Sequence, residues 1–211
     1  MTHNPPLSNP PICRSYLSDF TLEGDKVTGL AAVVESRTNI GNLFIEVIER
    51  GAFDSTDLTD VLFFVNHDMS KIPLARSRRN NGNSTMRLSV DERGLNMEAT
   101  LDIDSNAEAR ALVSAIKRND ISGMSFLFTV KEDSWENLNS DLPTRRIKKI
   151  GRVREVSAVN FPAYPQTEIH ARDTDSLEKE RWVLENARAQ GVDTQQRCEM
   201  WRLRNAILAK K

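Results

Sequence analysis

The stretch NDISGMSFLFTV, residues 119–130, constrains the fold more than any other part of the chain. Its residues alternate, so a β-strand would place Met124, Phe126 and Phe128 on one face and Ser125 on the other. Large apolar side chains on one face of a strand need a second apolar layer to pack against. A serine on the opposite face is either a filler facing water or a nucleophile facing a substrate. The sequence therefore predicts a layered β domain in which the second face of one strand can carry chemistry.

Most of the region 14–173 is also predicted to be β. Segments rich in β-branched and aromatic residues occur at 26–36, 42–49, 60–68 and 144–165. Residues 84–104 alternate, reverse at Asp91–Gly94 and alternate again, which is typical of a hairpin. The segment SNAEARALVSAIKRND changes to helical spacing, with Ser105 as the expected N-cap. The predicted fold class is α+β, mainly β.

Composition divides the chain into three parts. Residues 1–13 contain four prolines and are predicted to be a flexible N-terminal tail. Residues 14–173 would form the folded domain. Residues 174–211 are predicted to form a helical C-terminal tail that carries two of the three tryptophans, Trp182 and Trp201. An apolar stripe on a terminal helix packs on its own domain or on a partner more often than it takes part in chemistry.

Signals for the first helix of this tail are local. Asp175 and Glu178 have the spacing of a capping box, and Gly191 can end the helix. A second helix is expected over the final segment, DTQQRCEMWRLRNAILAKK.

The overall charge gives no general attraction to nucleic acid or to an anionic membrane. Lys+Arg is 29 and Asp+Glu is 30, so the net charge is -1. Apolar stretches such as VLFFV, residues 61–65, are too short to span a bilayer, and the proline-rich N-terminus lacks the apolar core of a secretory signal. Residues 144–154 contain six basic side chains, and residues 75–83 form a basic loop. Neither segment contains aromatic residues on which nucleic-acid bases could stack. A solvated strand face explains them better than a nucleic-acid site.

The two cysteines, Cys13 and Cys198, lie near opposite ends of the chain. They suit a reducing compartment, form no disulfide framework and have no metal-ligand spacing. The segment NHD, residues 66–68, offers two metal ligands without a third or fourth at a recognisable spacing. We therefore predict no metal site and no cofactor from the sequence.

Three polar residues interrupt apolar β segments: Ser125, His67 and Glu155. A serine, a histidine and a carboxylate that contact one another form an activated nucleophile, because the imidazole accepts the serine proton and the carboxylate orients the imidazole. The other two histidines, His3 and His170, lie in the tail and at the end of the domain. Each residue also has a structural explanation, since a histidine can close a strand and Glu155 can pair with a nearby arginine. From the residues alone, a serine hydrolase is one candidate among several.

Six segments follow one another in an order that is typical of a known family. They are GLAAVVES (29–36), IERGAFDST (48–56), VLFFVNHDMSKIPLARS (61–77), DERGLNMEATLD (91–102), DISGMSFLFTV (120–130) and IGRVREVSAVNFPAYPQTEI (150–169). Together they resemble the prohead (capsid maturation) proteases of tailed bacteriophages, which are related to the herpesvirus assemblin proteases. The most specific combination is NHD followed by PLAR, GMSFLF and EVSAVNFPAYP.

This resemblance implies roles for the three polar residues. Ser125 would be the nucleophile, His67 the general base and Glu155 the third member, in a serine endopeptidase that works through an acyl-enzyme without a cofactor. It also implies a closed or partly closed β-barrel decorated by helices, as in the assemblins. Family members usually have glycine where this chain has Ala75. The oxyanion hole is not assigned by the resemblance, and backbone N–H groups at Ser157–Asn160 are a candidate.

The resemblance further implies a place and partners. The enzyme would act inside the immature capsid (prohead) in the host cytoplasm, cleaving the scaffold segment of the major capsid protein, other internal proteins and itself. The portal and a second copy of the chain are further candidate partners, whereas membrane and nucleic-acid binding are not expected. The alternative is a non-enzymatic scaffolding or capsid-assembly module. In either case the C-terminal tail is expected to bind the scaffold segment or the portal.

Overall fold

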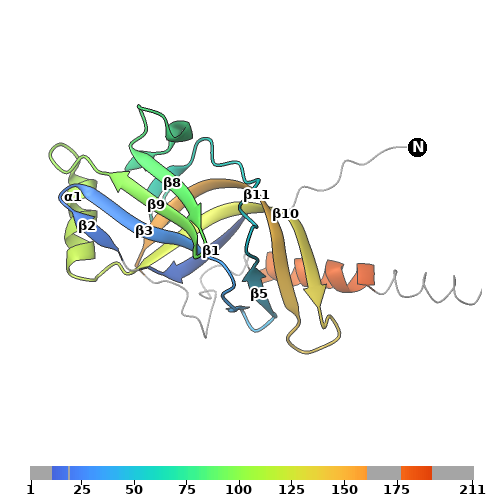
Figure 1. Cartoon of the computed structure of the whole chain (residues 1–211). Helices are drawn as coiled ribbons and strands as arrows, with labels where there is room; N and C mark the ends of the chain where they lie inside the picture. The colour runs from blue at the N-terminus through green and yellow to red at the C-terminus, as the bar shows by residue number, and fades with distance from the viewer. Residues whose placement is uncertain (1–10, 19, 161–176, 192–211) are drawn as a thin grey trace, which may run out of the picture.

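The computed structural model describes residues 11–18, 20–160 and 177–191, which form two β-sheets and two helices (Figure 1). The larger sheet has the order β1-β10-β11-β5-β4, and β6 and β7 extend it beyond β11. Its strands are β1 Ile12–Leu17, β4 Thr38–Ile40, β5 Phe44–Ile48, β6 Leu62–Val65, β7 Ala75–Arg76, β10 Gly123–Glu136 and β11 Thr144–Val159. The smaller sheet has the order β2-β3-β9-β8, with β2 Thr21–Glu23, β3 Lys26–Val33, β8 Met86–Asp91 and β9 Gly94–Thr100.

The two sheets form separate layers and not the closed or partly closed barrel that the resemblance implies. Closure requires the edge strands of a sheet to pair with each other. Over the described residues, the smaller sheet ends in β2 and β8, and neither is hydrogen-bonded to a strand of the larger sheet. In Figure 1 the smaller sheet lies across β10 and β11, and these two long strands continue past it into a hairpin. The mainly β class is confirmed, and the barrel is not supported.

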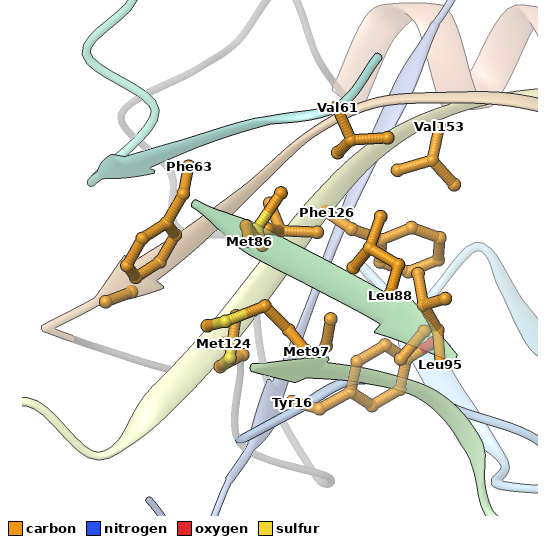
Figure 2. Packing of buried hydrophobic residues seen from close by; sticks show 14 of the residues in the cluster. Tyr16, Val61, Phe63, Met86, Leu88, Leu95, Met97, Met124, Phe126 and Val153 are labelled. Carbon is orange, nitrogen blue, oxygen red and sulfur yellow. The ribbon is translucent and has the colours of Figure 1, made fainter. Parts of the chain in front are cut away.

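The main hydrophobic core lies between the two sheets (Figure 2). From β10, Met124, Phe126 and Phe128 are fully buried, and the two phenylalanine rings stack with centroids 4.3 Å apart. Met97 of β9 packs into the same cluster. A Cβ added to Gly29 would lie 2.8 Å from the Met124 sulfur, so glycine lets β3 approach β10 closely. The predicted apolar face of residues 119–130 is therefore confirmed as a core face.

Most of the predicted elements are confirmed, with shifted ends. The segments at 26–36, 42–49 and 60–68 contain β3, β5 and β6, and the hairpin is formed by β8 and β9. Helix α1 spans Ala107–Lys117 and therefore begins one residue later than an N-cap at Ser105 would predict. Asn106 is the N-cap, and its side chain accepts hydrogen bonds from the N–H groups of Glu108 and Ala109. A short 3₁₀ turn, Arg78–Asn80, precedes β8.

The boundary of the N-terminal tail is two residues too late. Ile12 and Cys13 belong to β1, which pairs antiparallel with β10 from Ile12–Phe128 to Leu17–Gly123. Sequence patterning missed this strand because two polar residues, Arg14 and Ser15, interrupt its apolar alternation. Residues 1–10 of the predicted tail lie outside the described residues.

The described part of the C-terminal region is a helix over 177–191, drawn in orange in Figure 1 beside the β10–β11 hairpin. Leu184 is buried in a small cluster with Ile40 and Phe44. Trp182 leaves 48% of its surface exposed. The helix thus packs on the β region through one side and presents Trp182 on another. A separate tail from residue 174 stays a prediction, and the expected Asp175 cap, Trp201 and the second helix lie outside the described residues.

The basic residues of β11 mostly face carboxylates. Four of the six basic side chains in 144–154 form ion pairs: Arg145 with Asp133, Arg146 with Glu136, Lys149 with Glu132 and Arg152 with Asp57. The pairs of Arg146 and Lys149 are cross-strand pairs at the sheet surface, whereas Arg145 is buried. Neither helix among the described residues is long and apolar enough to cross a bilayer.

Candidate active site

Ser125 lies near the start of β10, on the face opposite the core. It is flanked by Ser15 of β1 and Ser157 of β11 in the sheet register. The residue has no exposed surface, and its hydroxyl donates to the backbone oxygen of Arg14 at 3.0 Å. The serine of the predicted strand is therefore neither a surface filler nor a core residue.

His67 lies beyond the end of strand β6 and does not close it, although alternation from Phe63 and Val65 would have continued the strand to His67. The strand ends at Val65, and both Asn66 and His67 have positive φ angles, 52° and 59°. The Asp68 N–H donates to the Val65 oxygen at 3.2 Å and closes the turn. Two consecutive positive φ angles are typical of tight I′-type turns, and histidine is one of the residues that adopt them most readily.

This turn decides which face of the sheet receives the imidazole. Phe63 aligns with Val156 of β11 on the core face, whereas Phe64 aligns with Ser157 on the opposite face. A regular strand would have sent His67 to the side of Phe63, away from Ser125. The reversal at Asn66–His67 places it over Ser125 instead.

His67 bridges the other two predicted residues through its two ring nitrogens. Nε2 lies 2.7 Å from the Ser125 hydroxyl oxygen, and Nδ1 forms a very short contact with Oε1 of Glu155. Its side chain is 26% exposed, so solvent reaches the group from the His67 side. The structure thus brings Ser125, His67 and Glu155 into one chain of contacts.

Glu155 projects from β11 onto the same face and is almost completely buried, with 1% of its surface exposed. Its Oε1 contacts His67, and its Oε2 accepts the Ser157 hydroxyl at 2.7 Å. The suggested pairing with a nearby arginine is not what the structure shows: Arg152 pairs with Asp57. A buried carboxylate needs partners of this kind, because an unpaired one would be costly.

Ser157 connects Glu155 to the turn that carries His67. This role of Ser157 was not predicted from the sequence. Besides donating to Glu155, its oxygen accepts the backbone N–H of His67 at 3.2 Å. It therefore fixes both the carboxylate and the turn that carries the imidazole. The spacing of Glu155 and Ser157, two residues apart on one strand, is a signal that could have placed them on the same face.

The strand next to Ser125 is held by buried charges. The Arg14 side chain makes two contacts with the Glu46 carboxylate, at 2.5 and 2.9 Å, and one with Glu180 of the 177–191 helix at 3.0 Å. Burial alone would lower the pKa of Arg14, but the Glu46 and Glu180 carboxylates outweigh it and raise the pKa above its usual value. The network fixes β1, whose Arg14 carbonyl meets Ser125.

The structure also bears on two further expectations, the oxyanion hole at 157–160 and the position of Ala75. Ser157 and Ala158 lie between β10 and β6, and the Asn160 N–H donates to the Asn66 side chain at 3.1 Å. These contacts give no support to an oxyanion hole at 157–160. Ala75 lies in β7, paired with Phe63 and buried in the core.

Comparison with known proteins identifies the family of this chain. A family model described as caudovirus prohead serine protease matches residues 17–180. The chain belongs to this family. The resemblance found in the sequence is therefore confirmed, and family membership supports a protease role in the prohead.

Other comparisons add little beyond the family. A search of curated proteins found no match. Among solved structures, the bacteriophage T4 capsid assembly protease, gp21, matches with 12% identity and a TM-score of 0.41, covering 71% of this chain and 97% of that one.

Proposed function

We propose that this prohead protease is a serine endopeptidase in which Ser125 is the nucleophile, His67 the general base and Glu155 the residue that orients His67. The observation that carries the proposal is the bridging imidazole, with Nε2 at 2.7 Å from the Ser125 oxygen and Nδ1 on Glu155. When Glu155 holds the proton on Nδ1, Nε2 presents its lone pair to the serine hydroxyl. This is the tautomer that a base for Ser125 requires.

The reaction follows from these contacts. Ser125 Oγ attacks the scissile carbonyl carbon while its proton passes to Nε2, and Glu155 stabilises the imidazolium that forms. The imidazolium then gives this proton to the leaving amine, and the C–N bond breaks to leave an acyl-enzyme. Water attacks the ester, with His67 again accepting and returning a proton. No cofactor is needed for any step.

The Ser125 hydroxyl has two acceptors in the resting structure. It donates to the Arg14 oxygen at 3.0 Å, and Nε2 lies at 2.7 Å on the other side. A rotation about the Cβ–Oγ bond moves the proton from one acceptor to the other. In this proposal β1 holds the hydroxyl in place until a substrate carbonyl arrives.

A serine-directed fluorophosphonate tests the roles of the residues directly. We expect one phosphonyl adduct per chain, on the peptide that contains Ser125, located by mass spectrometry. The adduct should be lost in Ser125→Ala and in His67→Ala, since labelling needs the hydroxyl and its base. Ser15→Ala, which changes the serine facing Ser125 on β1, is the matched control and should label normally. An adduct that persists in Ser125→Ala would refute the assignment.

We further propose that its substrates are the scaffold segment of the major capsid protein, other internal prohead proteins and the enzyme itself, cleaved within the prohead in the host cell. Family membership supports the setting.

A second, non-enzymatic role in assembly is favoured by Trp182, which is 48% exposed on the docked helix. Truncation before this helix would also remove the buried Glu180 and Leu184, so Trp182→Ala is the cleaner test. Reduced incorporation of Trp182→Ala into proheads, with peptide cleavage unchanged, is the expected result; normal incorporation would refute recruitment through Trp182.

A further inference from the structure

A third metal-binding side chain lies beside the His67–Glu155 pair. One possible ligand atom from each of Cys13, His67 and Glu155 lies within 4.8 Å of the other two. Sequence spacing does not predict this cluster, because the two possible ligands in residues 66–68 have no third ligand near them in the sequence. The third ligand, Cys13, lies on β1, 54 residues before His67 in the sequence.

The sheet register explains how these side chains meet. Cys13 lies opposite Leu127 on β10, and Leu127 lies opposite Glu155 on β11. Directly opposed residues share a face, so Cys13 and Glu155 lie in one row on the Ser125 side of the sheet. The turn after β6 brings His67 over this row. Cys13 is exposed and His67 partly so, which gives an ion a route from solvent.

We propose that Cys13, His67 and Glu155 bind one Zn²⁺ ion, and that this ion reversibly inhibits the protease. A thiolate, an imidazole and a carboxylate are all zinc ligands, at roughly 2.0–2.3 Å, with a water completing a tetrahedron. The thiolate and imidazole favour zinc over Mg²⁺ and Ca²⁺, which prefer oxygen ligands. The three ligand atoms lie within 4.8 Å of one another, and to share one ion they must move to roughly 3.3–3.8 Å apart, the separation that bonds of this length give in a tetrahedron.

Inhibition follows whichever imidazole nitrogen binds the ion. If zinc binds Nε2, the lone pair that faces Ser125 is no longer available to accept a proton. If zinc binds Nδ1, the remaining ring proton moves to Nε2, which then donates to Ser125 instead of accepting from it. Binding also releases the Cys13 thiol proton, because the metal takes the thiolate. In both cases the base is removed while the nucleophile stays intact.

The inhibitory part of this inference rests on the proposed function, whereas metal binding does not. Binding is therefore measured first on the inactive Ser125→Ala chain, which keeps all three ligands. Co²⁺ is the spectroscopic probe, and we expect a thiolate-to-cobalt charge-transfer band at one ion per chain that Zn²⁺ abolishes and Mg²⁺ leaves unchanged. The absence of this band at saturating Co²⁺ would overturn the proposal.

A matched pair of cysteine variants locates the thiolate. In the Ser125→Ala background, adding Cys13→Ala should abolish the charge-transfer band, whereas adding Cys198→Ser should leave it unchanged. The opposite pattern would place the ion at Cys198 and overturn the site.

The activity measurement uses the wild-type catalytic residues and a peptide substrate. Zn²⁺ should inhibit cleavage, and a chelator should restore it. Cys13→Ala should keep its basal rate and need at least about tenfold more Zn²⁺ for half-inhibition, the scale on which changes around a metal site alter affinity. Equal inhibition of both proteins would overturn the regulatory claim. A chain that binds Co²⁺ as predicted but never cleaves a peptide would contradict the proposed function and leave the metal site standing.

Discussion

Replacing Ser157 with alanine removes a buried hydroxyl that hydrogen-bonds to both His67 and Glu155. The change removes a hydrogen bond to the Glu155 carboxylate at 2.7 Å and one from the His67 N–H at 3.2 Å. Ser157 has no exposed surface, so water has poor access to the two groups left behind. We therefore expect the variant to fold with a loosened imidazole.

The size of the effect follows from the two bonds. A hydrogen bond to a charged group contributes about 1.5–3 kcal/mol and a neutral one about 0.5–1.5 kcal/mol. The two contributions together come to about 2–4.5 kcal/mol, of which part is lost as stability and part as alignment of His67. If half of this free energy appears in the transition state, kcat falls roughly 5- to 40-fold, because about 1.4 kcal/mol is a factor of ten in rate. KM should change less than about twofold, since Ser157 has no exposed surface with which to contact a substrate.

The assay is steady-state cleavage of a peptide taken from a mapped cleavage site, at a temperature where denaturation curves show both proteins folded. Ser15→Ala is the control, because it removes a hydroxyl from the other strand beside Ser125 and should keep kcat within about twofold. A Ser157→Ala variant with wild-type kcat would refute the positioning role. A rise in KM at unchanged kcat would assign Ser157 to substrate binding instead.

Three further substitutions test other parts of the account. Glu46→Ala leaves the buried Arg14 guanidinium short of its main partner, so we expect urea unfolding to show a loss of about 3–5 kcal/mol; a loss below 1 kcal/mol would mean the network contributes little. Gly94→Ala should cost at least about 2 kcal/mol in the same assay, because φ is 142° and the new Cβ would lie 2.0 Å from a backbone oxygen of β3; an unchanged midpoint would contradict this. Glu155→Gln should lower kcat less than His67→Ala does if Glu155 only orients the base, and the reverse order would argue that Glu155 is structural or is the base itself.

The local parts of the fold were predictable from sequence because short-range patterns determine them. Alternation over 119–130 was enough to place Ser125 on the face opposite Phe126 and Phe128. The hairpin at Asp91–Gly94 followed from alternation that reverses at a turn. In each case the pattern depends on residues within one strand or one turn, and the structure agrees.

Features that depend on partners distant in sequence were not predictable. The expected barrel is not supported, because closure depends on which edge strands pair with each other, and no single segment of the sequence determines that pairing. Strand β1 was missed because Arg14 is charged and an apolar alternation pattern does not expect it to be buried. Its burial depends on the Glu46 and Glu180 carboxylates, which compensate the desolvation of the guanidinium. The turn at Asn66–His67 was not predicted, although asparagine and histidine both adopt positive φ more readily than most residues. The side-chain contacts of Ser157 required the assembled sheet.

The central claim is that Ser125 is the nucleophile of a maturation protease. The most direct test is intact mass over time for wild-type and Ser125→Ala protein, each alone and co-expressed with the major capsid protein of the same virus. The account predicts fragments with wild type only, and their masses would give the cleavage sites. Fragments from both proteins would show that Ser125 is the wrong residue. Stable binding to the capsid protein without fragments from either would contradict the enzyme and favour an assembly module.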